Sequence, residues 1–115
     1  MKTFVKENTW LIRGSFMDFG WGNGYLIIPK GHPLHGKCYD TIHDLIPELE
    51  VNGGLTFADM ADNLEWDELP KGSEGSWVIG FDTAHCWDTL EMWSKEKVMQ
   101  ETEKLKNQLS TYEKF

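Results

Sequence analysis

Two carboxylates and an imidazole directly follow an apolar, β-favouring run. Asp82, His85 and Asp88 recur at a spacing of three after the sequence Trp-Val-Ile-Gly-Phe. In an extended strand His85 would face away from both aspartates, because successive side chains point to opposite faces. The three side chains converge only if the strand ends at about Asp82. An aspartate beside the ring could then orient it and raise its basicity, as in a general base, or the three groups could bind a divalent metal.

A second set of candidate ligands lies in segment 31–38, Gly-His-Pro-Leu-His-Gly-Lys-Cys. Pro33 favours an extended path with a period near three, which places His32 and His35 on one side, with Cys38 three residues further on. Together with His85, or with the cysteine that follows it, these residues would make four zinc ligands. The spacing matches no standard zinc motif. The alternative is a rigid surface loop whose histidines bind backbone carbonyls.

Two further features could belong to the same surface. Trp87 follows His85 closely, and tryptophans in loops are enriched at ligand pockets and interfaces. The glycines of the Asn-Gly-Gly turn at 52–54 would let a ligand approach the backbone. Each feature also has a structural reading, in which the tryptophan pins its loop, the glycines form a hairpin turn and the aspartates brace backbone N–H groups. The candidate ligand-binding residues are Asp82, His85, Trp87, Asp88, His32, His35, Gly53 and Gly54.

Short strands and turns must position these residues. β-Favouring runs predict strands at 9–13, 25–28, 48–51, 55–58 and 77–81, with a hairpin between the first two. Glycines predict a turn at 20–24. We expect one helical turn at 41–46 capped by Asp40, and an acidic loop at 59–76 pinned by Leu64 and Trp66.

The clearest element is an amphipathic helix over about 94–110 with Ser94 as its N-cap. Its expected buried stripe is Val98, Thr102, Leu105, Leu109 and Tyr112, widened by Met99. The sum is an α+β fold, in which a small, mostly antiparallel sheet packs against one long C-terminal helix. The 115 residues suit a single domain spanning 1–115.

Composition narrows the classes of partner and the compartment. The formal net charge of −8 repels phosphate backbones, so we expect no nucleic-acid partner. The charge fits a cationic partner or a basic protein surface, and the alternative is that it only keeps the protein soluble. No apolar run approaches roughly 18 residues, so we expect no membrane span. The chain starts without a signal-peptide pattern and has two cysteines, which indicates reduced thiols in a cytoplasm.

The chain resembles a family of small proteins encoded by phages and prophages of low-GC Gram-positive bacteria. The shared pattern extends over about residues 23–110. It comprises Asn-Gly-Tyr at 23–25, Pro-Lys-Gly-His-Pro-Leu-His-Gly at 29–36, Gly-Gly-Leu-Thr-Phe at 53–57 and Trp-Val-Ile-Gly-Phe-Asp-Thr-Ala-His at 77–85. The resemblance implies expression in the host cytoplasm and supplies no catalytic roles. Several small phage proteins counter host defence by binding a host protein or sequestering a nucleotide signal.

Three functions fit these observations. The first is a non-enzymatic protein that binds a small ligand or a host protein, with a homodimer allowed by the apolar helix stripe. The second is a metal-dependent hydrolase in which Asp82 and His85, with His32 and His35, hold a divalent ion. The third is a structural accessory whose polar residues only lock loops.

Overall fold

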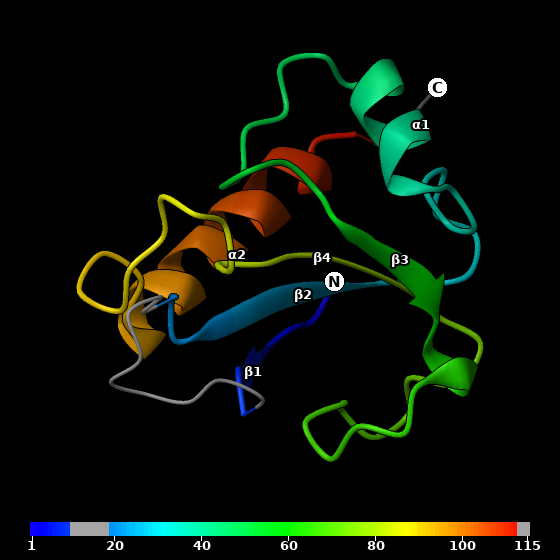
Figure 1. Ribbon diagram of the computed structural model, residues 1–115. Helices are drawn as coiled ribbons and strands as arrows, with labels where there is room; N and C mark the ends of the chain where they lie inside the picture. Colours follow the sequence, from blue (N-terminus) through cyan, green and yellow to red (C-terminus); the bar gives the residue numbers. More distant parts are fainter. Residues whose placement is uncertain (10–18, 113–115) are drawn as a thin grey trace.

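The computed structural model describes residues 1–9 and 19–112. Within them, four antiparallel strands form one sheet in the order β1-β2-β4-β3 (Figure 1). The strands are β1 (Thr3–Glu7), β2 (Gly22–Ile28), β3 (Phe57–Met60) and β4 (Trp77–Phe81). The helices are α1 (Tyr39–Leu45), a single 3₁₀ turn η1 (Ala61–Asn63) and α2 (Lys95–Ser110). The predicted α+β class is confirmed, and none of these helices is long and apolar enough to cross a membrane.

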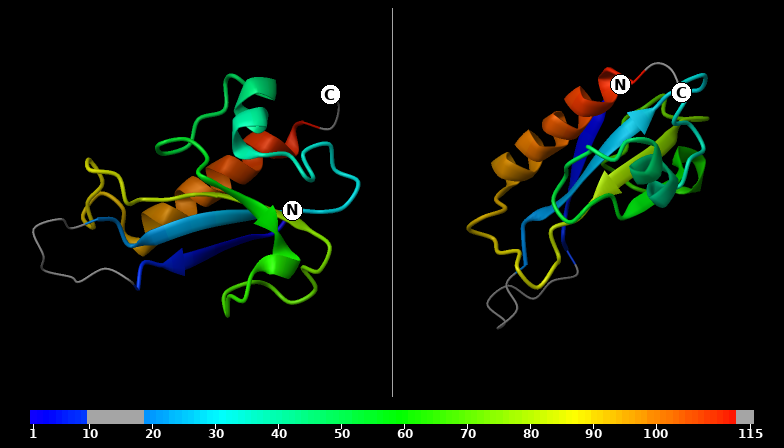
Figure 2. Two further views of the ribbon diagram at one scale, coloured as in Figure 1. Left: turned by 45° about the vertical axis from the view of Figure 1, so that its right-hand side comes forward. Right: turned by 90° about the horizontal axis from the view of Figure 1, so that it is seen from above.

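Helix α2 packs along one face of the sheet, against β1 and β2 (Figure 2). Four of its predicted stripe residues are buried, namely Val98, Thr102, Leu105 and Leu109. Burial of an aliphatic side chain of this size stabilises a fold by about 1.5–3 kcal/mol, so this stripe holds the helix in place. Met99 does not widen the stripe as expected. It is 48% exposed, because it lies at the border between the buried and the outer face of the helix.

The N-terminus of α2 begins at the predicted cap. The Ser94 side chain accepts a hydrogen bond from the Lys97 N–H. We expect Ser94→Ala to lower the free energy of unfolding by about 1 kcal/mol, because that N–H loses its acceptor. Urea denaturation would show this as a lower midpoint at unchanged slope. Ser110→Ala at the exposed opposite end is the control, and equal stability of the two variants would contradict the role of the cap.

The opposite face of the sheet carries a second, aromatic-rich cluster. Its buried members are Phe4, Tyr25, Ile27, Ala61 and Val78. Leu64 and Trp66 pack against this cluster, which confirms that they pin the 59–76 segment to the body. The two faces of the sheet are thus covered by different parts of the chain, and the end of β4 emerges between them.

The glycines before Tyr25 were wrongly predicted to form a turn. Gly22 and Gly24 lie inside β2, and a methyl group at Gly24 would overlap the Thr102 hydroxyl and the Phe81 ring. These glycines therefore allow close approach of neighbouring chain rather than chain reversal. β2 pairs with β1 and β4. The strand predicted at 9–13 lies, apart from Thr9, outside the described residues.

Other boundaries also differ from the prediction. Residues 48–51 form no strand, because the chain turns there with the Leu49 N–H bonded to the Ile46 carbonyl. β3 begins at Phe57 and continues to Met60, where η1 follows. Cys38, not Asp40, occupies the cap position of α1, and Asp40 lies in the first turn, where a negative charge favours a helix N-terminus.

Candidate functional site

The polar residues emerge from the end of a firmly held strand. β4 has the predicted bounds and pairs with both β2 and β3. Immediately beyond it, the buried Thr83 hydroxyl donates to the Gly22 carbonyl at 2.6 Å, and the Gly20 N–H donates to the Thr83 carbonyl at 2.8 Å. These bonds fasten the chain after β4 to the start of β2. The turn that follows is therefore built on a rigid base.

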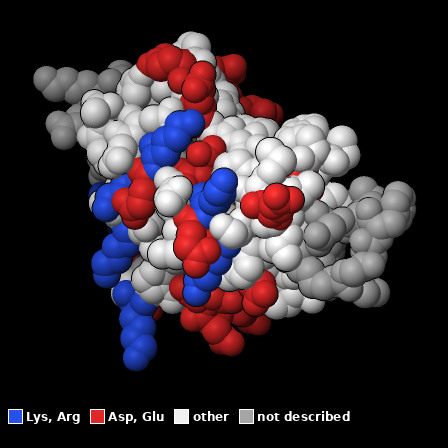
Figure 3. Space-filling model, turned by 90° about the vertical axis from the view of Figure 1, so that its left-hand side faces the viewer, with Lys and Arg blue, Asp and Glu red and all other residues white. Residues whose placement is uncertain are grey.

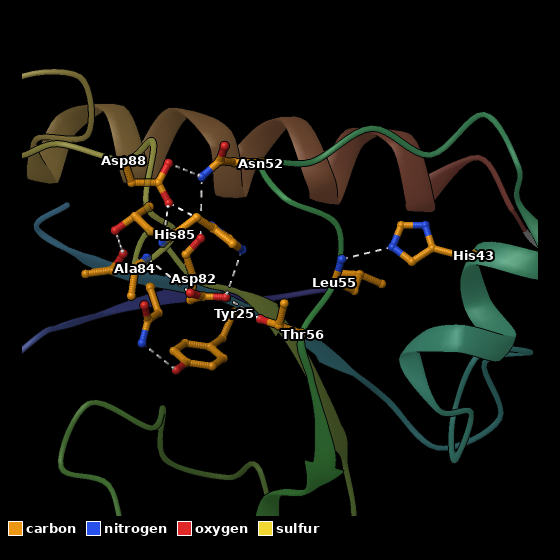
Figure 4. Close-up of polar contacts among 12 residues, drawn as sticks. Tyr25, His43, Asn52, Leu55, Thr56, Asp82, Ala84, His85 and Asp88 are labelled. Atoms are coloured by element: carbon orange, nitrogen blue, oxygen red, sulfur yellow. Dashed lines mark hydrogen bonds and ion pairs between the residues drawn. The ribbon is translucent and has the colours of Figure 1, made fainter. Parts of the chain in front are cut away.

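Asp88 is the buried centre of the polar network (Figure 4). Its Oδ2 accepts the backbone N–H of His85 at 2.9 Å and lies 2.7 Å from the ring Nδ1 of the same residue. Its Oδ1 accepts from Asn52 Nδ2 at 3.0 Å. Because an ionised carboxylate only accepts, His85 Nδ1 carries the hydrogen, and in the neutral ring Nε2 is then an acceptor. Asp88 thus fixes both the position and the tautomer of the ring.

Asp82 lies at the other side of the ring. Its Oδ1 is 3.7 Å from His85 Nε2 and accepts the Thr56 hydroxyl at 2.7 Å, and its Oδ2 accepts the Ala84 N–H at 3.1 Å. The two aspartates and the histidine therefore converge because β4 ends at Phe81, which was the condition set by the sequence. The partly exposed Asp82 side chain can still accept hydrogen bonds from a ligand.

The ring of His85 supports an exposed indole. The rings of His85 and Trp87 are nearly parallel, with centroids 4.7 Å apart and an interplanar angle of 7°. Trp87 is 57% exposed, whereas only 18% of the His85 side chain is exposed. Gly53 also lies against the imidazole, since a methyl group there would overlap the ring. An aromatic face is thereby presented to solvent on a fixed support.

The negative charge of Asp82 acts on Tyr25, which belongs to the aromatic-rich cluster on the opposite face of the sheet. Burial raises the pKa of Tyr25 above its usual value of 10.0, and the negative charges of Asp82 and Glu68 raise it further. The hydrogen bond from Asn23 to the Tyr25 hydroxyl acts in the opposite direction. The phenol therefore stays neutral at physiological pH beside the carboxylate.

The histidines of the 31–38 loop do not join this site. His35 Nε2 is bonded to the Gly75 carbonyl at 2.9 Å, just before β4 begins, whereas Asp82 follows its end. Strand β4, which lies between Gly75 and Asp82, is by itself roughly 13 Å long. His32 Nδ1 accepts the N–H of Leu34, within its own loop. The prediction that both loops share one surface is wrong, because the loop packs against the opposite end of β4.

A metal centre loses its expected ligands for the same reason. Of the four weak candidates, only Asp82 and His85 lie together, and no group of three His, Cys, Asp or Glu residues within 1–9 and 19–112 is arranged to hold an ion. Cys38 and Cys86 are both exposed and unbridged. Of the four ligands proposed for a metal-dependent hydrolase, only Asp82 and His85 therefore remain together.

Three residues of the site were missed by sequence reasoning. Asn52 and Thr56 bond the two aspartates, and His43 on α1 accepts the Leu55 N–H at Nε2, 2.9 Å away. The Asn-Gly-Gly sequence signals a turn, and it gives no sign that the asparagine side chain reaches Asp88. Gly54 lies beside His43 rather than in the candidate binding surface.

Comparison with protein-family models, curated proteins and solved structures finds no match.

Proposed function

We propose that the protein is a non-enzymatic binding protein whose ligand contacts Trp87 and donates hydrogen bonds to Asp82. The observation that carries this proposal is the indole, which is more than half exposed and yet held parallel to the His85 ring. Tryptophans that present an ordered face to solvent are typical of binding surfaces, because they bury a large area at little cost in side-chain entropy.

Bracing alone accounts for only part of this arrangement. Asp88 is buried and accepts from three donors of the protein itself, which suits a structural role. Trp87, in contrast, contributes little to the core, because most of its surface faces water. A loop-locking function would not require an exposed indole, so the binding function is preferred over a purely structural accessory.

The charge of the protein suggests what the ligand carries. The net charge is −8, and negative side chains lie among the lysines on the face drawn in Figure 3. Asp82 offers acceptors, and the indole face attracts cations through its ring quadrupole. A flat or cationic group with N–H donors is therefore the best fit, whether it belongs to a small molecule or to a protein side chain.

The phage resemblance provides the biological setting of the proposal. We place the protein in the cytoplasm of an infected or lysogenic host, where the partner is a host protein or small molecule and the outcome is interference with host defence. The homodimer was expected to form through the apolar stripe of α2, but that stripe is buried against the sheet of the same chain. A homodimer through another surface is part of the same proposal, and light scattering of the purified protein would measure it.

Trp87→Ala tests the binding surface. We expect the substitution to abolish partner binding while changing the free energy of unfolding by less than about 1 kcal/mol, since the side chain is mostly exposed. The measurement is the set of host proteins and metabolites retained by the immobilised protein. Met92→Ala is the matched control, because Met92 is 54% exposed in the same loop region. Identical retention by wild type and Trp87→Ala would contradict the proposal.

A further inference from the structure

We infer that His43 is a pH-sensitive latch on the segment 52–56, which supports the candidate binding surface. His43 lies on α1, and its Nε2 accepts the backbone N–H of Leu55 at 2.9 Å (Figure 4). Only an unprotonated ring nitrogen can accept this bond, so the proton of the neutral ring resides on Nδ1. Protonation of Nε2 would set two N–H donors against each other and remove the bond.

The latched segment makes three of the contacts that hold the candidate surface together. Asn52 donates to Asp88, Gly53 lies against the His85 ring, and the Thr56 hydroxyl donates to Asp82. Movement of this segment would therefore act on both aspartates and on the ring that supports Trp87. The effect on ligand binding rests on the proposed function, whereas the latch itself does not.

Other bonds limit how far the segment can move. The Asn52 N–H donates to Glu101 on α2, the Gly54 N–H to the Val51 carbonyl and the Thr56 N–H to the Gly80 carbonyl. Loss of the Leu55 bond alone would thus loosen the centre of the segment and leave its ends attached. The expected result is a local opening rather than global unfolding.

A pH-dependent change at Leu55 must be assigned to His43 and not to another titratable group nearby. Segment 52–56 itself carries no titratable side chain, so the groups to consider lie on the elements around it. Glu101 on α2 accepts the Asn52 N–H, and the other acidic residues on the adjoining elements are Asp40 and Asp44 on α1 and Glu48 and Glu50 in the connection. Carboxylates titrate near pH 4, whereas histidines change charge between about pH 5 and 8. His85 is the other histidine beside this segment, in contact with Asp82, Asp88 and Trp87, so the experiment must change His43 alone.

The test is amide hydrogen exchange of Leu55 in the full-length protein, expressed as a protection factor and followed together with the NMR shifts of the His43 ring. Between pH 7.5 and 5.5 we expect the protection factor to fall about fivefold. This is the change in the opening equilibrium that the loss of one ordinary hydrogen bond produces. In His43→Gln, whose amide oxygen can accept at any pH, we expect the factor to stay constant. His35→Gln, which changes a histidine at the other end of β4, should keep the wild-type pH dependence.

Three results would overturn the latch. One is a protonated His43 ring with unchanged Leu55 protection in the wild type, which requires no variant to fold. Another is a ring that stays neutral down to pH 5.5. The third is an equal loss of protection in His43→Gln. None of these measurements uses a ligand, so a failure of the binding proposal leaves a distinct signature, namely an intact latch with no partner retained.

Discussion

Replacing Asp88 by alanine is expected to lower the free energy of unfolding by about 3 kcal/mol. The carboxylate is buried and accepts from the His85 backbone, from the His85 ring and from Asn52. Removal takes the acceptor away from these three donors, of which Asn52 Nδ2 keeps only its longer bond to the Asp82 carbonyl at 3.5 Å. Each buried unsatisfied donor costs about 1–3 kcal/mol. The partly exposed His85 ring can recover water, which keeps the total below the sum. Urea denaturation followed by circular dichroism measures the change.

Asp88→Asn is the matched control for this prediction. Asparagine keeps the shape and one acceptor oxygen, but it turns an NH₂ group toward a donor, so we expect an intermediate loss of stability. The indole N–H group of Trp87 should also become more mobile in Asp88→Ala, because the His85 ring on which the indole stacks is released. Stability of Asp88→Ala within about 0.5 kcal/mol of wild type would show that Asp88 does not hold the turn.

Gly53→Ala is expected to destabilise the protein more than Gly36→Ala, by about 1–3 kcal/mol. Both glycines have positive φ, +70° and +82°, so alanine suffers similar backbone strain at either position. A methyl group at Gly36 meets open space, whereas one at Gly53 overlaps the His85 ring. The difference between the variants therefore isolates the packing of segment 52–56 against the imidazole.

Thermal or urea unfolding of the two variants gives this difference, and the Trp87 indole shift reports whether the ring has moved. Equal losses of stability with an unchanged indole shift would mean that Gly53 and His85 are not in contact. A larger loss for Gly53→Ala with a displaced indole shift would link the Asn-Gly-Gly turn directly to the candidate binding surface.

The elements that the sequence predicted well are those with an uninterrupted pattern. β4 is a continuous apolar run and α2 has four buried residues at helical spacing, so both were placed within a residue of their bounds. The convergence of Asp82, His85 and Asp88 followed from the point at which β4 ends. The turn predicted at Gly22 and Gly24 was wrong, because glycine is typical both of turns and of places where a neighbouring chain approaches closely. Only tertiary packing distinguishes the two.

The remaining parts of the site depend on contacts between distant segments. Asn52 lies 36 residues before Asp88, and Thr56 lies 26 residues before Asp82. No local pattern encodes such pairings, since an asparagine or threonine in a turn bonds its own backbone equally well. His35 shows the converse, because its spacing from His32 fits either a ligand pair or a loop whose histidines bind backbone carbonyls. The fold decides for the second at His35, which bonds the carbonyl of Gly75.

The central claim is that Trp87 forms a fixed, exposed surface before any ligand arrives. The most direct test is the ¹⁵N relaxation order parameter of the Trp87 indole N–H in the ligand-free protein. If the indole is held by His85 and Asp88 as described, the order parameter will be near that of rigid backbone, about 0.85. A value below about 0.6, typical of a flexible group, would contradict the claim and leave Trp87 as a mobile loop side chain.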